Sequence, residues 1–385
     1  MNREQLRREL PEPVRRYFEE VARMEPPVDL LSAAITKVES EPRVNRFSLL
    51  PAMVAVAATA VIAAVIAFNV FGLKVGPFVG DDASPTPQGS PTMQTMPPLE
   101  GLPSAGTIEQ RYSIPADAGF PALEAHGSVW LSNGETGVVT RIDAETGQIT
   151  AQIDVNPNPE TDRYDQNLVA DESYVWATGA DRTLVQIDPA TNAVLERFDI
   201  SVLIYRMVVS GDDIWISDLN DTNSVIRFST TAGEVTLRRP MTNWPGGLAV
   251  AENGDVWVTP YQADDLLRLD PETGDQLESN TVRSFGMQIL LFGDALYISG
   301  NQGRPLERFS IPDGRVTARF SQETRPELFN GRLYGLEGEA LIVLDAATLQ
   351  VVAALDMGPN LGGLLAGSDS LWIVQGTEIL KVRPA

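Results

Sequence analysis

The alternation of apolar and polar positions repeats along most of the chain and predicts β-strands. The stretch RIDAETGQITAQIDV, from Arg141, has counterparts in QIDPATNAVLERFDI from Gln186, RLDPETGDQLES from Arg268 and LDAATLQVVAALDM from Leu344. In each copy a short apolar run ends at an Asp, a Thr follows three residues later, and apolar residues then recur at every second position. This pattern predicts a β-hairpin with one buried face.

The turn of each hairpin is specified by side chains that hydrogen-bond nearby backbone amides. Asp143 and Thr146 form the first pair, which recurs as Asp188 and Thr191, Asp270 and Thr273, and Asp345 and Thr348. Short Asp and Thr side chains hold tight turns in this way. Positive φ is tolerated next, at Gly147, Asn192 and Gly274, which predicts a turn with a bulge. After the first turn, the residues expected on the buried face are Ile149, Ala151, Ile153 and Val155.

An aromatic residue recurs upstream of each hairpin at intervals of 37 to 46 residues. The seven positions are Trp130, Trp176, Trp215, Trp257, Tyr297, Tyr334 and Trp372. A further apolar run precedes each aromatic, so each repeat of about forty residues contains four strands. That period and strand count are typical of a propeller blade. We interpret the seven aromatics as structural core between blades.

The ends of the repeat region predict closure into a ring. The last repeat, SLWIVQGTEILKVRPA, stops after its third strand, and TIEQRYSI at residues 107–114 precedes the first repeat. If this segment supplies the missing fourth strand, no sheet edge is left unpaired there. We predict an all-β fold: a seven-bladed β-propeller with four-stranded blades over residues 107–385, closed by the N-terminal strand 107–114.

The repeated motifs carry a family resemblance. The patterns G-x-(V/I/L)-W-x-(S/T) and (I/L)-D-x-x-T-G resemble those of YVTN-type propellers and of virginiamycin B lyase-like propellers. The resemblance extends over residues 107–385 and implies the propeller fold. It implies little about function, because propellers host many unrelated activities.

Residues 47–73 contain no charged side chain and read as a transmembrane anchor. Some 25 helical residues span roughly 37 Å, enough to cross a bilayer core of about 30 Å. The alternative is a cleaved signal peptide, but 46 residues precede the apolar run, far more than the leader of a signal peptide. Lys37, Arg43 and Arg46 lie just before the anchor, whereas only Lys74 lies just after it. This asymmetry predicts a cytoplasmic N-terminus and an extracytoplasmic propeller at the cell membrane.

Two further segments flank the predicted anchor. Residues 74–106 hold seven prolines among Gly, Ser and Thr, which favours an extended extracytoplasmic linker. Residues 1–46 read as short amphipathic helices in a cytoplasmic tail. This tail either lies at the membrane interface or docks to a cytoplasmic protein. The layout loosely resembles that of membrane-bound anti-sigma regulators, although the His and Cys zinc ligands that many of these carry are missing.

The charge distribution excludes some partners. The formal net charge is −23. Residues 1–48 carry nine basic and nine acidic side chains, so the whole net negative charge comes from the residues that follow them. This strongly acidic part of the chain would repel nucleic acid, which argues against nucleic acid as a partner. The chain has no cysteine, which excludes disulfides and thiolate chemistry.

The sequence offers no set of catalytic residues. The lyase resemblance implies a histidine base and a magnesium ion held by carboxylates in the late blades. The one histidine is His126, in the first blade, where we expect it to cap a turn before the Trp130 strand. Quinone-dependent propellers share the D-x-x-T-G turn, but their eight blades and vicinal cysteines are absent. We therefore expect no cofactor and, on balance, no enzyme; a carboxylate pair remains an alternative.

One loop has the oxygen ligands of a cation site. SDLNDTNS, from Ser217, contains Asp218, Asn220, Asp221 and Asn223 at a spacing that suits calcium. The loop lacks the turn glycine and distal glutamate of an EF-hand. We interpret it as an ordinary polar hairpin and predict no metal site.

The loops that lead from the outermost strand of one blade into the innermost strand of the next form a rim around the central channel. Propellers usually bind their ligands there. The rim residues are Asp165, Gln166, Tyr205, Arg206, Trp244, Phe285, Gln288, Arg325, Glu327 and Asn360. Arginine suits carboxylate recognition, and Tyr and Trp supply contact area. The alternative is that these residues only pack the loops.

Together these patterns indicate a membrane-tethered extracytoplasmic β-propeller that binds a small ligand or a protein partner without catalysis. One alternative is a virginiamycin B lyase-like enzyme with a diverged active site. The other is a transmembrane sensor that signals through the cytoplasmic tail, residues 1–46.

Overall fold

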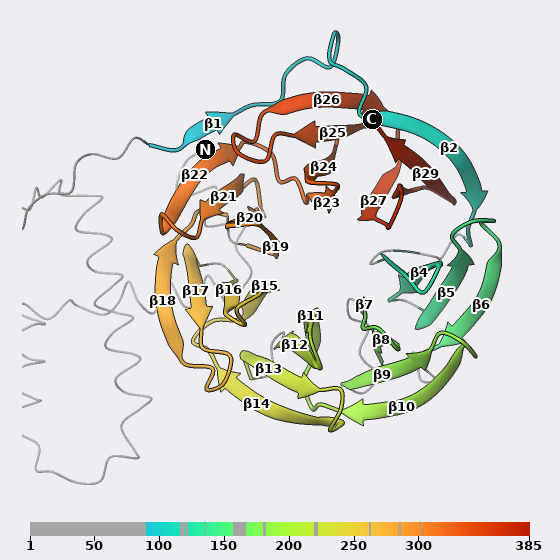
Figure 1. The fold of residues 1–385 in the computed structure, drawn as a ribbon, viewed down its shortest axis with the longest axis vertical. Helices are drawn as coiled ribbons and strands as arrows, with labels where there is room; N and C mark the ends of the chain where they lie inside the picture. Colours follow the sequence, from blue (N-terminus) through green and yellow to red (C-terminus); the bar gives the residue numbers. More distant parts are fainter. Residues whose placement is uncertain are drawn as a thin grey trace, which may run out of the picture. The chain divides into compact units, whose positions relative to one another are not determined.

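Seven β-sheets arranged around a central axis form the described part of the chain (Figure 1). The structure is a computed structural model. It describes residues 90–385 except 116–118, 120–121, 135, 157–166, 180–181, 219–221, 262, 285 and 301. The predicted helical tail (1–46) and anchor (47–73) lie outside the described residues. Within the described residues, no helix has the length and apolar character needed to cross a bilayer.

Blades 1 to 4 each consist of four consecutive antiparallel strands, running from the channel outward. Blade 1 contains β3 (Ala122–Ala125), β4 (Ser128–Asn133), β5 (Val138–Asp143) and β6 (Ile149–Asp154). Blade 2 contains β7 (Leu168–Ala170), β8 (Val175–Thr178), β9 (Thr183–Asp188) and β10 (Ala193–Asp199). Blade 3 contains β11 (Ile204–Ser210), β12 (Asp213–Asp218), β13 (Ser224–Ser229) and β14 (Glu234–Pro240). Blade 4 contains β15 (Pro245–Val250), β16 (Val256–Pro260), β17 (Asp265–Leu269) and β18 (Gln276–Thr281).

Blades 5 and 7 each include a strand from the N-terminal side, whereas blade 6 again consists of four consecutive strands. Blade 5 contains β19 (Gln288–Phe292), β20 (Ala295–Ser299), β21 (Leu306–Ser310) and β22 (Arg315–Phe320), with β1 (Thr92–Gln94) outside them. Blade 6 contains β23 (Glu327–Phe329), β24 (Arg332–Glu337), β25 (Ala340–Leu344) and β26 (Val351–Asp356). Blade 7 contains β27 (Leu361–Ala366), β28 (Leu371–Gln375) and β29 (Glu378–Pro384), completed by β2 (Gly106–Ser113).

The predicted closure of the ring is confirmed. Strand β2 pairs antiparallel with β29, placing Ile108 opposite Val382, so the N-terminal strand is the fourth strand of the last blade. The strand begins at Gly106, one residue before the predicted start. A side chain at Gly106 would not fit, because its Cβ would lie 2.6 Å from the Arg383 carbonyl oxygen.

The residues before β2 lie against the propeller. Strand β1 pairs in parallel with β22, from Thr92 opposite Ala318 to Gln94 opposite Phe320, and Ser104 bridges to Ala354 of blade 6. The sequence placed residues 74–106 in an extended linker; residues 90–105 instead follow the outer edges of blades 5 and 6 (Figure 1). Edge strands expose unpaired backbone groups, and these short pairings satisfy part of them.

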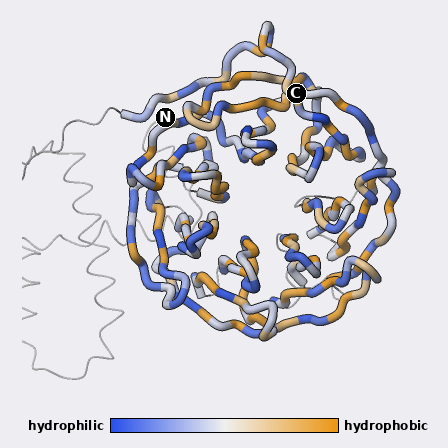
Figure 2. Tube along the Cα trace, viewed as in Figure 1, coloured by the Kyte–Doolittle hydropathy of each residue, from blue (hydrophilic) through white to orange (hydrophobic). Residues whose placement is uncertain are grey.

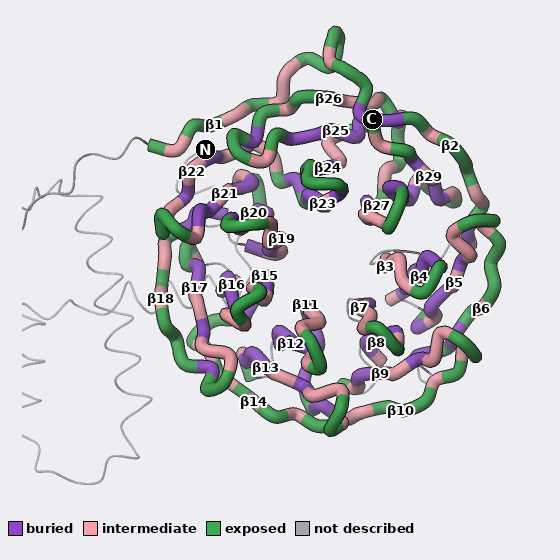
Figure 3. The backbone as a smooth tube through the Cα atoms, in the orientation of Figure 1, coloured by how far each residue is buried: buried purple, intermediate pink, exposed green. Residues whose placement is uncertain are grey.

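The seven recurring aromatics lie in the hydrophobic core. All seven are at most 3 % exposed, and each packs in a hydrophobic cluster. In blade 1 the second strand is fully buried, whereas most residues of the outermost strand are exposed (Figure 3). Apolar and polar residues interleave along the strands (Figure 2), because the side chains of a strand alternate between its two faces.

A basic side chain joins each of several blades to the next one. Arg227 lies opposite Trp215 on the neighbouring strand, its Cζ is 5.8 Å from the ring centroid, and its Nη1 donates a 3.0 Å hydrogen bond to Pro271 O in the next blade. Lys381 Nζ likewise lies over the Trp372 ring, 5.3 Å from its centroid, and donates a hydrogen bond to Ala144 O of blade 1. The repeated turn therefore has a second function: its second carbonyl accepts a hydrogen bond from the preceding blade.

The turn chemistry predicted from the sequence is confirmed, with one correction about the strand after it. Asp143 Oδ1 accepts hydrogen bonds from Thr146 N and Oγ1, both at 2.7 Å, and Gly147 has φ +68°. Ile149 pairs with Ile142, but the next pair is Ala151 with Arg141, so the register shifts by one residue after Ile149. Such a bulge breaks the period-two alternation. Ile149 is consequently 45 % exposed rather than buried with Ile153.

Candidate functional site

The connections of the blades divide between two ends of the ring. In a blade of four antiparallel strands, the loop into the blade and the loop between strands two and three lie at one end. The loops between strands one and two and between strands three and four lie at the other. We call the first end the mouth face and the second the turn face. The Asp-Thr turns lie on the turn face, so the repeated motif is remote from the loops that carry Arg325 and Trp244.

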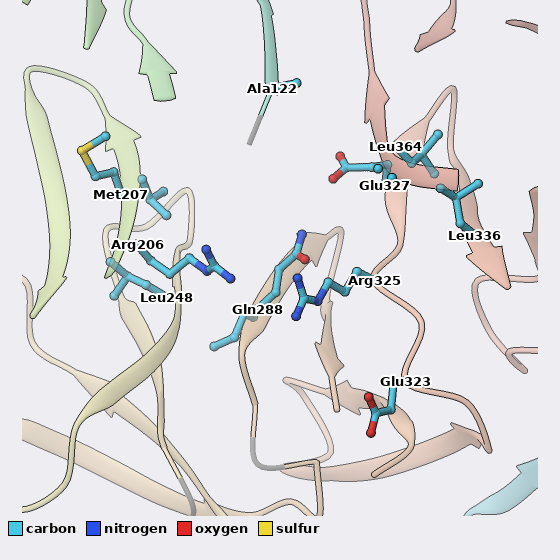
Figure 4. Close-up of a pocket in the computed structure, with 14 residues that line it drawn as sticks. Ala122, Arg206, Met207, Leu248, Gln288, Glu323, Arg325, Glu327, Leu336 and Leu364 are labelled. Atoms are coloured by element: carbon cyan, nitrogen blue, oxygen red, sulfur yellow. The ribbon is translucent and has the colours of Figure 1, made fainter. Parts of the chain in front are cut away.

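A cavity of about 550 Å³ opens among the innermost strands near the mouth face. Four of the predicted rim residues line it together: Arg206, Gln288, Arg325 and Glu327. Figure 4 shows the side chains of Arg206, Gln288 and Arg325 directed into the same space, with the Glu327 carboxylate across it. These residues come from blades 3, 5 and 6 and from the β22–β23 loop, so only ring closure brings them together.

Arg206 is held in a defined direction by its neighbours. The register of β11 and β12 shifts between Ile204 and Arg206, which leaves Tyr205 as a bulge residue. Bulges re-aim the side chains next to them. The guanidinium lies over the Tyr205 ring, with Cζ 4.6 Å from the centroid, and Nε donates a 3.1 Å hydrogen bond to Met287 O of blade 5. The hydrogen bond to Met287 O, which joins blades 3 and 5, holds the guanidinium in the cavity.

Tyr205 itself supports Arg206 rather than lining the cavity. Its side chain is buried, its hydroxyl contacts Met287 Sδ at 3.1 Å, and its carbonyl accepts a 2.9 Å hydrogen bond from Asn167 Nδ2. Tyr205 thus connects blade 3 with blades 2 and 5 around the channel.

Arg325 is the second cation of the cavity. It is exposed, and none of the described residues gives its side chain a hydrogen bond or an ion-pair partner. The buried Pro326 follows it, and a residue before proline is restricted to extended backbone. Figure 4 shows the Arg325 side chain directed toward those of Gln288 and Arg206.

Glu327 is a half-buried carboxyl group two residues further on. Burial raises its pKa to about 7, while hydrogen bonds from the Gln288 side chain and the Ala366 backbone lower it. A carboxyl group with a pKa near neutrality in a cavity is typical of functional sites. At neutral pH its charge therefore varies with small changes of environment.

Gln288 is positioned by a close contact between blades 4 and 5. The buried Thr259 Oγ1 donates a 2.9 Å hydrogen bond to Gly286 O and accepts one of 2.9 Å from Gly247 N. A Cβ at Gly286 would lie 2.6 Å from Thr259 Oγ1, so glycine is required for this approach. The contact fixes the backbone two residues before Gln288.

The other predicted rim residues lie elsewhere. Trp244 is 37 % exposed and stacks on Tyr261, with centroids 5.7 Å apart and ring planes at 6°, outside the cavity lining. Asn360 is an exposed turn residue with φ +67° whose carbonyl accepts a hydrogen bond from Gly376 N. Asp165, Gln166 and Phe285 lie outside the described residues.

Sequence reasoning missed the apolar wall and one acid. Met207, Leu248 and Leu364, from innermost strands, line the cavity, and so does Glu323. A signal for the apolar residues was present, because the run before each aromatic is the innermost strand and one of its faces must border the channel. The direction of Glu323 depends on the β22–β23 loop, for which the sequence contains no pattern.

His126 and the Asp218 loop lie apart from this cavity. His126 lies with φ +51° in the β3–β4 turn before the Trp130 strand, on the turn face, as predicted. Asp218 Oδ2 accepts hydrogen bonds from Thr222 N and Oγ1, each at 2.7 Å. The described residues contain no group of three or more His, Cys, Asp or Glu side chains placed to hold a metal ion. Asn220 and Asp221 lie outside the described residues.

Fold and cavity define a seven-bladed β-propeller with an arginine-bearing mouth. The sequence matches the family described as outer membrane protein assembly factor BamB over residues 135–352, more than half of the chain. The chain belongs to this family. Among curated proteins none matches it.

Solved propellers resemble the chain in fold. Virginiamycin B lyase from Staphylococcus aureus aligns with a TM-score of 0.60 and 16 % identity, over 72 % of this chain and 99 % of the lyase. A streptogramin B lyase structure gives a TM-score of 0.59 and 17 % identity, over 72 % and 97 %. The computationally designed protein Ika8 gives 0.53 and 12 %, over 71 % and 99 %. At these identities the likeness shows the fold alone, which confirms the predicted resemblance at that level.

Proposed function

We propose that this chain is a non-catalytic binding protein whose propeller takes a ligand or a protein partner at the mouth-face cavity. The observation that carries the proposal is the convergence of Arg206 and Arg325, from different blades, on one cavity of about 550 Å³. Small-molecule sites are concave, a few hundred Å³ in size, and combine apolar walls with a few convergent polar groups. This cavity has each of these properties.

Family membership supports the binding role. The family description, outer membrane protein assembly factor BamB, names a role in assembly and no reaction. The single histidine of the chain lies on the turn face, away from the cavity. This placement supports the part of the proposal that the lyase histidine has no counterpart here.

The proposal also includes tethering at a membrane. Residues 47–73 form the anchor, the N-terminus is cytoplasmic, and the propeller is extracytoplasmic. The absence of charge from residues 47–73 and the excess of positive charge on their N-terminal side support this arrangement. Residues 90–105, which follow the outside of blades 5 and 6, lead into the closing strand β2.

The binding role is tested by thermal unfolding of the full-length chain in a neutral detergent. Metals, quinones, cell-wall fragments and peptides are added in turn. A ligand at 100 times its Kd stabilises the native state by about 2.7 kcal/mol. For a domain of this size that raises the midpoint by roughly 4–5 °C. The Arg206→Glu variant serves as the control. A shift that persists in this variant places binding elsewhere and contradicts the proposed site.

One observation favours an enzyme as the second candidate. Glu327 lines the cavity, and its pKa of about 7 suits a general base or acid at neutral pH. A catalytically inactive virginiamycin B lyase has been solved with quinupristin. Mass spectrometry of quinupristin incubated with the chain tests this alternative. Consumption that is lost in Glu327→Gln would support the enzyme; unchanged quinupristin supports the binding protein.

A further inference from the structure

The charge of the cavity differs from that of the protein around it. The chain carries a net charge of −23, yet two guanidinium groups point into this one cavity. The described residues that line it include two arginines, Arg206 and Arg325, and two acids, Glu323 and Glu327. Guanidinium groups present rigid forks of N–H donors that match a carboxylate in two-point contacts. The two arginines can therefore receive an anionic group, in a lining whose formal charges balance.

The rest of the lining restricts which anion fits. Val208 and Leu336 are half-buried apolar residues of the lining, and a bare inorganic ion would leave their exposed surface in contact with water. The carbon skeleton of an organic molecule covers such surface and gains free energy from its burial. Glu323 and Glu327 disfavour a doubly charged group next to the arginines. A singly charged carboxylate on an apolar skeleton satisfies both requirements.

We propose that this cavity binds a small organic molecule through a carboxylate placed between Arg206 and Arg325, with its apolar part against Val208 and Leu336. The inference rests on the proposed binding function and assigns the chemical class of the ligand. Gln288 lies between the two arginines in Figure 4; one of its amide hydrogens is bonded to Glu327, and the second can be donated to a polar atom next to the carboxylate.

The geometry also makes binding depend on pH. Glu327 borders the same cavity, and its ionised form repels a bound carboxylate. The other charged groups that line this cavity are Arg206, Arg325 and Glu323. Glu337 accepts a hydrogen bond from Thr324, and burial, together with the nearby charge of Glu323, raises its pKa. The pKa of Glu327 is raised to about 7 by burial, so it takes up a proton between pH 8 and pH 6. The carboxylate of the ligand remains ionised over that range. Affinity therefore rises as pH falls from 8 to 6, by on the order of tenfold.

The experiment uses ligand-detected NMR on the full-length chain in a neutral detergent, with hexanoate and benzoate as probes. Hexanamide and benzamide are neutral probes of the same shape, and inorganic phosphate tests a bare anion. We expect saturable transfer to the two carboxylates and a Kd at least tenfold weaker for the amides and for phosphate. Equal binding of acid and amide would overturn the carboxylate assignment, and so would preferential binding of phosphate.

Matched variants locate the site. Arg325→Gln removes one cavity cation from an exposed loop, so its folding is expected to be unaffected. Arg383→Gln removes the same charge from a side chain that is 66 % exposed on β29, outside the cavity lining. We expect at least tenfold weaker binding of hexanoate in the first variant and unchanged binding in the second. Equal losses in both would show a general charge effect and overturn the proposal.

The pH dependence separates this site from nonspecific attraction. In Glu327→Gln the Kd for hexanoate is expected to be the same at pH 6 and pH 8, whereas the parent chain binds more tightly at pH 6. An unchanged pH dependence in the variant would overturn the role of Glu327. The proposed function is judged separately. A neutral ligand that stabilises the parent chain but not Arg206→Glu would preserve the proposed binding function and refute the carboxylate class.

Discussion

Trp372 of the last blade donates a 2.6 Å hydrogen bond from its indole Nε1 to the carboxylate of Glu124 in the first blade. The other carboxylate oxygen accepts hydrogen bonds from Ser368 N, at 3.0 Å, and Ser368 Oγ, at 2.5 Å. Glu124 thus joins the two ends of the repeat array on the innermost side. Strand β2 joins the same ends on the outermost side.

We predict that Glu124→Ala destabilises the propeller by about 2–3 kcal/mol, because the buried indole N–H of Trp372 loses its acceptor. Urea unfolding monitored by tryptophan fluorescence measures the change. Glu109→Ala is the matched control: its ion pair with Arg383 lies on the surface, where such pairs contribute about 0–1 kcal/mol. Equal effects of the two substitutions would contradict a special role for Glu124 in closure.

A second prediction concerns the Asp-Thr turns at low pH. Hydrogen bonds from the Thr three residues later hold the pKa of Asp143, Asp188, Asp270 and Asp345 below its usual value. A folded-state pKa below that of the unfolded chain adds stability above the unfolded value, about 3.9, and this stability is lost as pH falls through the folded value.

The urea midpoint should therefore fall more steeply from pH 5 to pH 2 in the parent chain than in a variant with Asn at all four positions. Asn keeps the side-chain oxygen that accepts from the Thr amide, so the turns persist without the charge. A parallel decline in both proteins would show that acid acts on other groups.

A third prediction uses two glycines near the cavity. In Gly286→Ala the new Cβ would lie 2.6–2.8 Å from Thr259 Oγ1, Thr259 Cγ2 and Ile298 Cγ2, all of them in buried side chains. Overpacking of this kind costs about 1–3 kcal/mol. Because the same loop carries Gln288, ligand binding should weaken as well. In Gly362→Ala the nearest atoms lie at 3.4–3.7 Å, ordinary contact distance, and stability should change little. A neutral Gly286→Ala would mean that the blade 4–5 contact is not tight.

A fourth prediction tests the membrane arrangement and exploits the absence of cysteine. Ser84→Cys places a single thiol after the predicted anchor, and Ser32→Cys places one before it. With a membrane-impermeant maleimide on cells whose outer envelope has been opened, only the first variant should be labelled. Labelling of the second, or of neither, would contradict the predicted orientation.

The candidate site was predictable only in part. The sequence predicted that Arg206, Gln288, Arg325 and Glu327 lie on loops or strand starts around the channel, because the blade period fixes where each innermost strand begins. Trp244 satisfies the same rule, yet its ring stacks on Tyr261 outside the cavity lining. The position of a residue within the repeat predicts the loop in which it lies. The direction of its side chain depends on contacts with other blades.

The sequence by itself determined the number of blades, the strand that closes the ring, the buried aromatics and the chemistry of the turns. These features follow from local periodicity and from side chains that bond their own backbone, so they are written within windows of about forty residues. Only the tertiary structure decided that Met287 O orients Arg206, that Glu124 accepts from Trp372, and that residues 90–105 lie along blades 5 and 6. Each of these contacts joins residues from different blades or repeats, and a closed ring brings them together by geometry that no local pattern records.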